Sequence, residues 1–410
     1  MGRDFDVEKV REQFPALNRT YKGQRVVYFD GPGGSQAVKS SIDAIAGYMM
    51  RGGANLHGAF PTSHETEAII AETRQTVAAF LGAQPQEIAF GPNMTTLNLA
   101  ISRALSRTWE AGSEIVVSEL DHRANVDPWL LAARDRGVHV KWLTVDKETL
   151  TLNLDELDSL ITEKTKLVAI GLSSNAVGTV TNVSKVAKRA HEAGAVVAVD
   201  AVHAAPHIVI DRDELGADIL LCSAYKFFGP HVGIAAIRSN LFEQLEPYKL
   251  HPAPTYIPDK LETGTQNHEG IAGVNGAISF ISTLGRGATL REKLVNAMNT
   301  VEEHENRLAD KLRQALRALP GVTLYAAPEP YRKTPTLAFR VASLSPRQVC
   351  ETMAEEYGIF IADGDFYAAT LADKLGINSS GGWIRAGLAP YNTEYEVEAF
   401  LEALERIARK

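Results

Sequence analysis

Short apolar runs of strand length alternate with helical patterns along most of this sequence, and this alternation limits the fold more than any other feature. The runs are Val26–Phe29, Glu87–Phe90, Glu114–Val117, Val138–Leu143, Leu167–Leu172, Ala195–Val199, Ile219–Cys222 and Gly233–Ile237. Helical patterns lie between many of them, at His64–Leu81, Asn98–Ser106, Pro128–Arg136, Asp155–Glu163 and Lys185–Ala193. Strands that are apolar on both faces and separated by helices predict an α/β fold with a mainly parallel sheet covered on both sides.

The pattern changes after about residue 267. Two long helical stretches, Gly270–Leu284 and Leu290–Leu319, follow each other without a strand between them. After them come two strand-like segments, Val322–Ala326 and Thr336–Val341, and then a helix, Pro346–Tyr357. A short strand, Ile359–Ile361, the segment Trp383–Leu388 and a final helix, Thr393–Ile407, complete the sequence pattern. We predict a large domain over residues 26–267 and a small α+β domain over residues 268–410, connected by the long helix. An N-terminal arm, residues 1–25, is expected to pack against the small domain or a partner subunit.

Composition and charge exclude several classes of protein. The net charge of −8 over 410 residues argues against a nucleic-acid partner, which would select a basic surface. No apolar run approaches the roughly 18 residues that span a bilayer, and the N-terminus lacks the apolar core of a secretory signal. We therefore expect a cytoplasmic protein without a membrane partner. The two cysteines, Cys222 and Cys350, are too few for a disulfide framework or a cysteine-rich metal site, and we predict no metal.

The strongest local signal is Ser223-Ala-Tyr-Lys226, which follows the apolar strand Ile219–Cys222. A lysine flanked there by aromatic residues is placed against apolar surface, where desolvation favours the neutral, nucleophilic amine. The alternative is a lysine that extends from the strand end into water. Taken alone, this segment favours the alternative.

Polar residues follow other predicted strands in the same way. Asp200 closes the strand Ala195–Val199, and His203 lies three residues further on. The acid is suited to a salt bridge or a turn, or to pairing with a protonated heterocyclic nitrogen. His122 follows Glu114–Val117, where it can stack on an aromatic ligand or move a proton, or belong to a polar loop that caps the next helix.

Gly91-Pro-Asn-Met94-Thr95 forms a strand-to-helix turn, which is suited to a phosphate or to a plain helix cap. Asn175 follows another strand. No single segment is decisive, but together they place six polar residues at strand ends of one sheet: Thr95, His122, Asn175, Asp200, Ser223 and Lys226. A phosphate site, an acid, a stacking imidazole and an amine add up to pyridoxal phosphate chemistry.

The order of these segments resembles the fold-type-I pyridoxal-phosphate enzymes of aminotransferase class V, and most closely their cysteine desulfurase and selenocysteine lyase branch. The resemblance extends from Tyr28-Phe-Asp-Gly-Pro-Gly-Gly to Arg385-Ala-Gly-Leu-Ala-Pro-Tyr-Asn-Thr. It implies a seven-stranded sheet in a cofactor-binding large domain. It also implies pyridoxal 5'-phosphate as cofactor, a small amino acid as substrate and a homodimer with a shared active site.

The resemblance also implies a role for each matching residue. Lys226 would hold the cofactor as a Schiff base and move the Cα proton, Asp200 would keep the pyridine nitrogen protonated, and His122 would stack on the ring. Asn175 would lie near the phenolic oxygen and the substrate, and Arg385 would bind the substrate carboxylate. The remaining implied contacts, to phosphate or ring, are Met94, Thr95, His203, Ser223 and, across the dimer, His268.

The chain departs from the desulfurase pattern at several positions. His203 replaces a glutamine, Tyr225 replaces a histidine, and Tyr367 stands where the loop of a desulfurase carries its persulfide-forming cysteine. Cys222 and Cys350 lie in apolar-patterned elements, where a buried, unreactive thiol is expected.

We therefore hypothesise a β-elimination that cleaves a C–S or C–Se bond without a persulfide. Tyr367 or Asp365 would protonate the leaving group, or would belong to a solvated loop with one aromatic anchor. One alternative is transamination, racemisation or epimerisation on the same scaffold. Another is a non-catalytic sensor or assembly protein. A nucleotide site at Gly31-Pro-Gly-Gly is weakly supported, because Gln36 replaces the last glycine of the motif.

Overall fold

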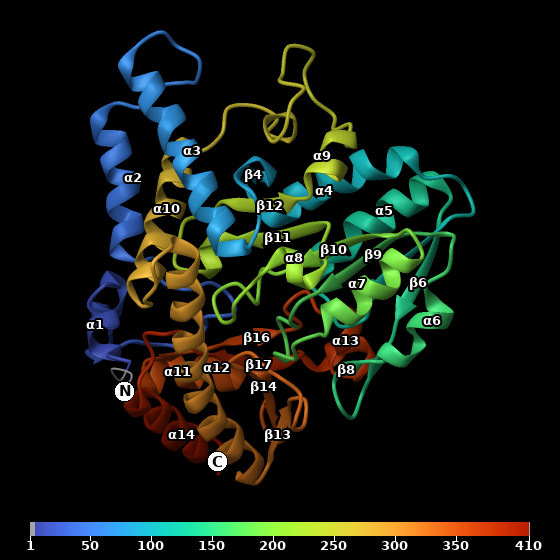
Figure 1. Cartoon of the computed structure of the whole chain (residues 1–410). Coiled ribbons are helices and arrows are strands. Elements are labelled where there is room, and N and C mark those ends of the chain that lie inside the picture. Colours follow the sequence, from blue (N-terminus) through green and yellow to red (C-terminus); the bar gives the residue numbers. More distant parts are fainter. Residues whose placement is uncertain (1–4, 410) are drawn as a thin grey trace.

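Seven strands form the large sheet at the centre of the molecule (Figure 1). The computed structural model describes residues 5–409. In spatial order the strands are β4 (Ile88–Gly91), β12 (Gly233–Ile237), β11 (Ile219–Ser223), β10 (Val196–Asp200), β9 (Thr165–Gly171), β5 (Glu114–Ser118) and β6 (His139–Leu143). β12 runs antiparallel to both of its neighbours, and the other pairs are parallel. The mainly parallel sheet predicted from the sequence is thereby confirmed.

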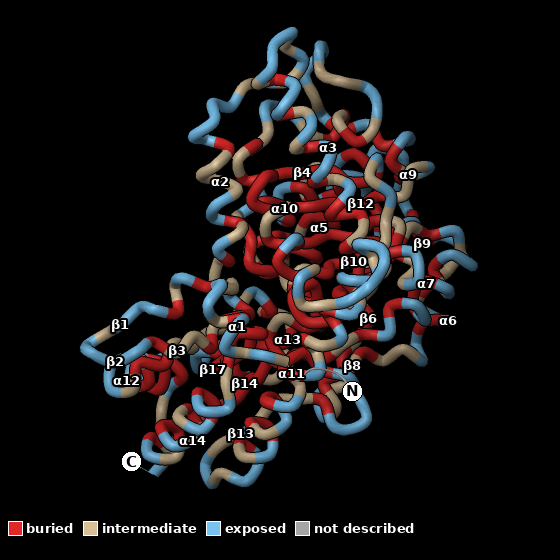
Figure 2. The backbone as a smooth tube through the Cα atoms, turned by 60° about the vertical axis from the view of Figure 1, so that its left-hand side comes forward, coloured by how far each residue is buried: buried red, intermediate tan, exposed pale blue. Residues whose placement is uncertain are grey.

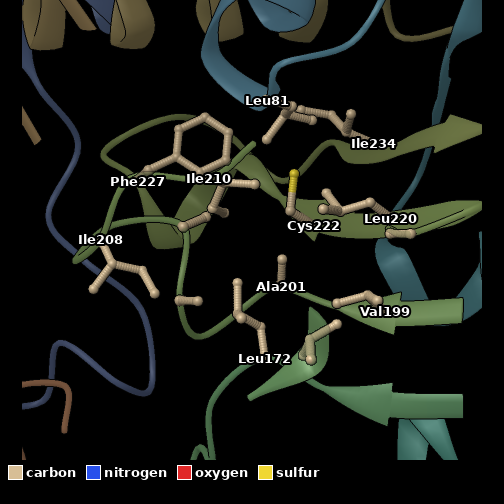
Figure 3. Packing of buried hydrophobic residues seen from close by; sticks show 14 of the residues in the cluster. Leu81, Leu172, Val199, Ala201, Ile208, Ile210, Leu220, Cys222, Phe227 and Ile234 are labelled. Atoms are coloured by element: carbon tan, nitrogen blue, oxygen red, sulfur yellow. The ribbon is translucent and has the colours of Figure 1, made fainter. Parts of the chain in front are cut away.

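Helices cover both faces of this sheet. One face packs against α3 (Pro61–Leu81), α7 (Val183–Glu192) and α10 (His268–Thr283), and the other against α4 (Met94–Leu105) and α5 (Asp127–Arg136). Successive strand residues point to opposite faces, so Val197 and Val199 belong to one apolar cluster and Ala198 to the other. In Figure 3, Cys222 of β11 packs between Leu220, Ile234 and the side chains of the first face.

A second, four-stranded antiparallel sheet lies at the end of the molecule that holds the C-terminus (Figure 1). Its strands are β13 (Val322–Tyr325), β14 (Thr336–Val341), β17 (Trp383–Gly387) and β16 (Ala362–Gly364). The apolar core there also includes side chains of α11 (Leu290–Ala318), α12 (Pro346–Tyr357) and α14 (Glu394–Ala408). The predicted bounds of β14 and α12 are confirmed.

Three sequence predictions need correction. The first apolar run does not join the large sheet, because β3 (Val27–Tyr28) pairs in parallel with β15 (Ile359–Phe360). The helix predicted over 155–163 is reduced to α6 (Leu157–Leu160), since the chain turns there to bury Ile161 and enter β9. The prediction missed α2 (Lys39–Arg51), whose Met49 and Met50 are exposed, so that its sequence lacks a clear apolar stripe.

The remaining elements are short. They are α1 (Val7–Arg11), β1 (Thr20–Tyr21), β2 (Gln24–Arg25), β7 (Val145–Asp146), β8 (Thr151–Leu152), α8 (Arg212–Leu215), α9 (Ser239–Gln244) and α13 (Ala369–Lys374), together with single 3-10 turns. In Figure 2 the buried backbone is concentrated in the strands of the large sheet, whereas the β1–β2 hairpin is largely exposed.

The N-terminal arm contacts elements of both cores, and its Val10, Phe14 and Leu17 belong to the apolar cluster of the large sheet. Arg11 forms a salt bridge of 2.8 Å with Glu396 of α14, and Phe14 makes edge contacts with Phe280 of α10 and with Tyr391. Residues 1–4, the first residues of the predicted arm, lie outside the described residues. Within residues 5–409, no helix combines the length and the apolar character that crossing a bilayer requires.

Candidate active site

The carboxyl ends of the central parallel strands open into a cavity of about 310 Å³. Residues from the start of α4, from β17 and from the loop after β16 complete its walls. Ten of the eleven predicted site residues line it: Met94, Thr95, His122, Asn175, Asp200, His203, Ser223, Lys226, Tyr367 and Arg385. Side chains that are up to about 290 positions apart in the sequence thus meet in one place, as expected for a site at the strand ends.

Lys226 lies three residues beyond β11, in the 3-10 turn Ala224–Lys226. Its Nζ donates a short hydrogen bond to the carbonyl oxygen of Pro32 and lies 4.9 Å from the ring centre of Tyr225. Burial, together with the positive charge of Arg385, lowers the pKa of Lys226 to about 7. A substantial fraction of this amine is therefore unprotonated, and nucleophilic, at neutral pH.

Asp200 is the last residue of β10 and is almost fully buried. Its Oδ1 accepts a hydrogen bond of 2.9 Å from the backbone nitrogen of Val202. Burial raises the pKa of Asp200 to about 7, and the nearby carboxyl group of Asp121 raises it further. An ionised carboxylate in this position is costly unless a cation lies against it.

Asp121 is a second buried acid of the cavity wall. It accepts hydrogen bonds from Ser118 Oγ at 2.8 Å and from Asn125 Nδ2 at 2.9 Å. Burial raises its pKa to about 6. Its two oxygens are thus occupied by neighbouring side chains, whereas Asp200 keeps one oxygen for a ligand.

His122 begins a 3-10 turn directly after Asp121. Its Nδ1 accepts a hydrogen bond of 2.9 Å from the backbone nitrogen of Ala124, so the ring proton is on Nε2. Burial and the positive charges of Lys226 and Arg385 lower the pKa of His122 to about 4. The imidazole is therefore neutral at neutral pH, as a ring that stacks on an aromatic ligand should be.

The start of α4 forms part of the cavity wall. The backbone nitrogen of Met94 donates a hydrogen bond of 3.1 Å to Ser223 Oγ, and the exposed Thr95 lines the cavity. The neighbouring strand β12 approaches closely at Gly233, where a Cβ atom would lie 2.3 Å from the carbonyl carbon of Asn93. Backbone donors at a helix start, next to two hydroxyl groups, are suited to a phosphate.

Arg385, on β17, is buried and lines the cavity. Its Nη1 donates a hydrogen bond of 2.9 Å to the backbone oxygen of Asn175, and its Nη2 lies 3.8 Å from Asp30 Oδ1. The ring of Phe366 covers the guanidinium at 3.8 Å, and Nε has no hydrogen-bond partner among residues 5–409. Burial lowers the pKa of Arg385 to about 10, so the side chain still carries its charge at neutral pH.

The loop after β16 brings Phe366 and Tyr367 to the cavity. Both residues have positive φ angles, +54° and +57°, which non-glycine residues seldom adopt. The neighbouring chain holds them there: Asn175 Nδ2 donates to the Phe366 oxygen and the Arg123 nitrogen to the Tyr367 oxygen, each at 2.8 Å. The ring of Tyr367 lies 5.2 Å from that of His122, tilted by 31°. In this conformation the ring of Phe366 lies against Arg385 and the ring of Tyr367 lies next to His122.

Two predicted residues have other partners than expected. His203 lines the cavity, but its Nε2 lies 2.8 Å from Oγ1 of Thr336, the first residue of β14. His268, the first residue of α10, faces Tyr48 at 3.4 Å and borders a separate recess of about 810 Å³. Whether His268 reaches a partner's cofactor, as the sequence predicts, stays a prediction.

Both cysteines are buried, as predicted. The side chain of Cys222 packs on the face of β11 that α3, α7 and α10 cover, and burial raises the pKa of its thiol (Figure 3). Burial also raises the pKa of Cys350, on α12, to about 12. Neither thiol has the exposure and positive surroundings that a thiolate nucleophile needs.

The polar groups of the cavity fit pyridoxal 5'-phosphate. Ser173 Oγ and Asn175 Oδ1 both line it and are shielded from solvent without a hydrogen-bond partner among the described residues. Asp200 is a buried acid whose pKa is raised, α4 offers donors for a phosphate, and Lys226 is an amine with a lowered pKa. One ligand with a phosphate, a basic ring nitrogen and an aldehyde would satisfy all of these groups.

Three contributors were not among the predicted site residues. Asp121 lies three residues after β5 and next to His122, so the rule that singled out residues beyond strand ends would also have found it. Pro32 acts through its backbone oxygen, for which residue type gives no signal. Phe366 contacts Arg385 from a residue with positive φ, a conformation that the sequence does not reveal.

Known proteins resemble this chain over almost its whole length. The family described as "Aminotransferase class-V" matches residues 27–400. An uncharacterised protein of Mycobacterium tuberculosis is 33% identical over 408 residues, covering 98% of both chains. A cysteine desulfurase of Klebsiella pneumoniae is 31% identical over 421 residues, covering 99% of both. Among solved structures, a cysteine desulfurase from Thermococcus onnurineus NA1 in its apo form superposes with a TM-score of 0.89 at 27% identity, covering 100% of this chain and 99% of the other.

Proposed function

Because the chain belongs to the aminotransferase class-V family, we propose that it is a lyase that cleaves the C–S or C–Se bond of a small amino acid by β-elimination. It is a pyridoxal-phosphate-dependent enzyme with the type I fold of the cysteine desulfurases, as predicted from its sequence. The reaction, the substrate and the residue roles below are proposals.

In this proposal, five groups hold the cofactor. Asp200 pairs with the ring nitrogen, His122 lies on the ring, and Met94, Thr95 and Ser223 bind the phosphate. The support is their common position around one cavity and the raised pKa of Asp200, which a cationic ring nitrogen would compensate. When bound, the cofactor withdraws electrons from the substrate Cα.

Lys226 would join the cofactor and then take the Cα proton. A pKa of about 7 suits both tasks, because the amine is partly unprotonated before the reaction and able to accept a proton during it. Neutral His122 avoids a second positive charge next to this amine.

Arg385 would bind the substrate carboxylate. Its Nε is unpaired and its Nη2 makes only a long contact to Asp30, so two donors on one edge remain for a bidentate ligand. Asn175 and Phe366 hold the guanidinium from other sides, which orients the fork before substrate arrives.

One observation carries the choice of elimination over sulfur transfer. The loop that would supply a persulfide-forming cysteine instead places Tyr367 over His122, and both cysteines of the chain are buried elsewhere. Tyr367, with Asp365 hydrogen-bonded to its backbone nitrogen at 2.9 Å, is then the candidate proton donor to the leaving group. Without a thiolate acceptor, sulfur would leave as sulfide.

The test is to incubate the purified, cofactor-loaded protein with L-cysteine and L-selenocysteine. β-Elimination converts cysteine and water to pyruvate, ammonia and hydrogen sulfide in equal amounts. Alanine together with a persulfide on the protein, detected by mass spectrometry, would contradict the proposal. An inverted Cα, or a keto acid without ammonia, would instead indicate racemisation or transamination. A protein that forms no borohydride-fixed adduct at Lys226 would indicate a non-catalytic role.

We further propose a homodimer that shares its active sites. Its support is the recess bordered by His268 and by residues 263–266, next to the exposed apolar side chains of Tyr248 and Leu250. A partner's cavity facing this recess would bring His268 to the phosphate. Light scattering in solution tests the dimer: a monomeric, fully active enzyme would refute it. The domain limits 26–267 and 268–410 stay a prediction.

A further inference from the structure

Residues 30–35 contain the Gly-Pro-Gly-Gly motif of the sequence, to which the reaction proposed above gives no role. The segment begins against β17, the strand of Arg385. The backbone nitrogen of Gly387 donates a hydrogen bond of 2.7 Å to the oxygen of Phe29, and Asp30 forms a parallel β-bridge with Gly387. This pairing fixes the Asp30 backbone beside β17, two residues along the strand from the arginine.

The same segment ends against the turn of Lys226. The backbone nitrogen and the Oγ atom of Ser35 donate hydrogen bonds of 3.2 and 3.1 Å to the oxygen of Tyr225. Lys226 Nζ itself donates to the carbonyl oxygen of Pro32. A Cβ atom at Gly34 would lie 3.3 Å from the Tyr225 ring, so the segment packs closely on this turn. One short segment therefore contacts the elements that carry the lysine and the arginine of the cavity.

The carboxylate of Asp30 lies next to Arg385. Its Oδ1 is 3.8 Å from Arg385 Nη2 and is shielded from solvent without a hydrogen-bond partner among residues 5–409, although the side chain as a whole is 45% exposed. Gly33 leaves room for this carboxylate, because a Cβ atom there would lie 2.6 Å from Asp30 Oδ2. At 3.8 Å an anion compensates the guanidinium charge without occupying one of its hydrogen-bond donors.

The charges of the three side chains act on one another. Burial raises the pKa of Asp30, and Arg385 and Lys226 oppose that rise. Burial and Arg385 lower the pKa of Lys226, whereas Asp30 and Asp200 raise it. Burial also lowers the pKa of Arg385, and Asp30 opposes that change. Asp30 is therefore an acid that acts on both cations.

Other titratable groups face Lys226 from the neighbouring elements. Asp200, at the end of β10, is the same in every variant compared below. Burial and Lys226 lower the pKa values of His122 and His203, so both rings are neutral at pH 7. Burial raises the pKa of Tyr225, which is likewise uncharged. Asp30 also raises the pKa values of two further uncharged groups, Tyr391 and Cys350.

We propose that Asp30 is a positioning residue of the active site: held by a segment fixed to both β17 and the turn of Lys226, its carboxylate is the common counter-ion that lets Arg385 and Lys226 carry positive charge in one buried cavity. The inference rests on the proposed role of Lys226 as the amine that joins the cofactor, but not on which amino-acid reaction follows. It also gives the Gly-Pro-Gly-Gly motif a function, since Gly33 makes room for the carboxylate and Pro32 supplies an acceptor for the lysine.

The test measures how fast the cofactor adds to the cofactor-free protein as pH is varied, with no amino acid present. In the wild type this rate should rise with a midpoint near pH 7, as Lys226 loses its proton. Asp30→Asn removes a negative charge that stabilises the protonated amine, so the midpoint should fall by about 0.5 to 1 pH unit. Asp363→Asn is the matched control: it lies on the neighbouring strand β16, pairs with Arg347 at 3.3 Å, and should leave the midpoint unchanged.

Two more variants separate charge from packing. Asp30→Glu keeps the carboxylate and should restore the midpoint to within about 0.3 pH unit of the wild type. Arg385→Gln removes a positive charge and should raise the midpoint. A cavity that merely loosens admits water, which would favour the protonated amine and raise the midpoint in every variant. A fall in Asp30→Asn together with a rise in Arg385→Gln therefore indicates charge.

A folded Asp30→Asn protein with the wild-type midpoint would overturn the proposal, as would an Asp30→Glu midpoint as low as that of Asp30→Asn. Asp30→Ser, a second uncharged variant, decides the question if Asp30→Asn does not fold. Borohydride fixation and mass spectrometry identify the reacting amine of the wild type. With the adduct on Lys226, an unchanged midpoint refutes only the role of Asp30. An adduct on another lysine would refute the proposed function, and this inference with it.

Discussion

Replacing Asp200 by asparagine should stabilise the cofactor-free protein, although it should destroy the cofactor site. The carboxyl is buried, and its pKa is raised from 3.8 to about 7. Asparagine has nearly the same shape, keeps an oxygen for the Val202 nitrogen and never ionises. The substitution therefore removes the cost of a buried charge while leaving the packing in place.

The magnitude follows from the two pKa values. A folded-state pKa above the unfolded value means that the folded state is favoured most below pH 3.8 and loses stability as pH rises through about 7. With about 1.4 kcal/mol per pH unit, the cost of ionisation reaches about 2 kcal/mol at pH 5 and about 4 kcal/mol at pH 8. The free-energy advantage of Asp200→Asn should therefore grow by about 2 to 3 kcal/mol between these pH values.

Urea unfolding of the two cofactor-free proteins at pH 5, 6.5 and 8 measures this growth. Asp135→Asn, at a side chain that is 68% exposed, is the control and should show no such trend. If the stability difference between Asp200→Asn and the wild type stays constant or shrinks as pH rises, the raised pKa of Asp200 is refuted. The loaded proteins should show the opposite order, because a protonated ring nitrogen beside the carboxylate removes the cost that asparagine avoids.

Further predictions concern individual side chains. Lys226→Ala should abolish turnover and the borohydride-fixed adduct, and normal activity would exclude Lys226 as the reacting amine. In the unaltered apo protein, the rate of cofactor addition should rise through about pH 7 as Lys226 loses its proton, which stopped-flow absorbance can follow; a rise centred near pH 10 would contradict the lowered pKa. Arg385→Ala should raise KM by about 100-fold or more with a smaller change in kcat, consistent with a lost bidentate charge-assisted contact of about 3 kcal/mol. Tyr367→Phe should lower kcat for cysteine elimination if its hydroxyl protonates the leaving group, whereas an unchanged kcat would leave the ring only a packing role.

The residues at the strand ends could be predicted because one rule governs them. Parallel strands of one sheet end at the same edge, so a lysine, an acid and an imidazole that each follow a strand must meet there. This reasoning brought together His122, Asp200 and Lys226 without any contact information. It could not supply the orientation of His203, because the hydroxyl groups that fix its ring lie more than 130 positions away on another sheet.

The loop residues could not be predicted for a different reason. Phe366 and Tyr367 are held in left-handed backbone conformations by the Asn175 side chain and the Arg123 backbone, and neither residue type favours that conformation. Helix α2 was missed because its apolar methionines face solvent. In both cases tertiary contacts decide the local structure, and local sequence carries no trace of them.

The charges of the cavity also explain why so many perturbed groups occur together. Burial is the first cause of every shift: it raises the pKa of the acid Asp200 and lowers the pKa values of the bases Lys226, His122 and Arg385. Near pH 7 the ligand-free site thus moves toward neutral side chains. A ligand that brings a phosphate and a ring cation would reverse this for Asp200, because each added charge meets its opposite in a medium of low dielectric constant. A ring cation paired with Asp200 would therefore offset the desolvation cost of that carboxylate, which favours binding of such a cofactor.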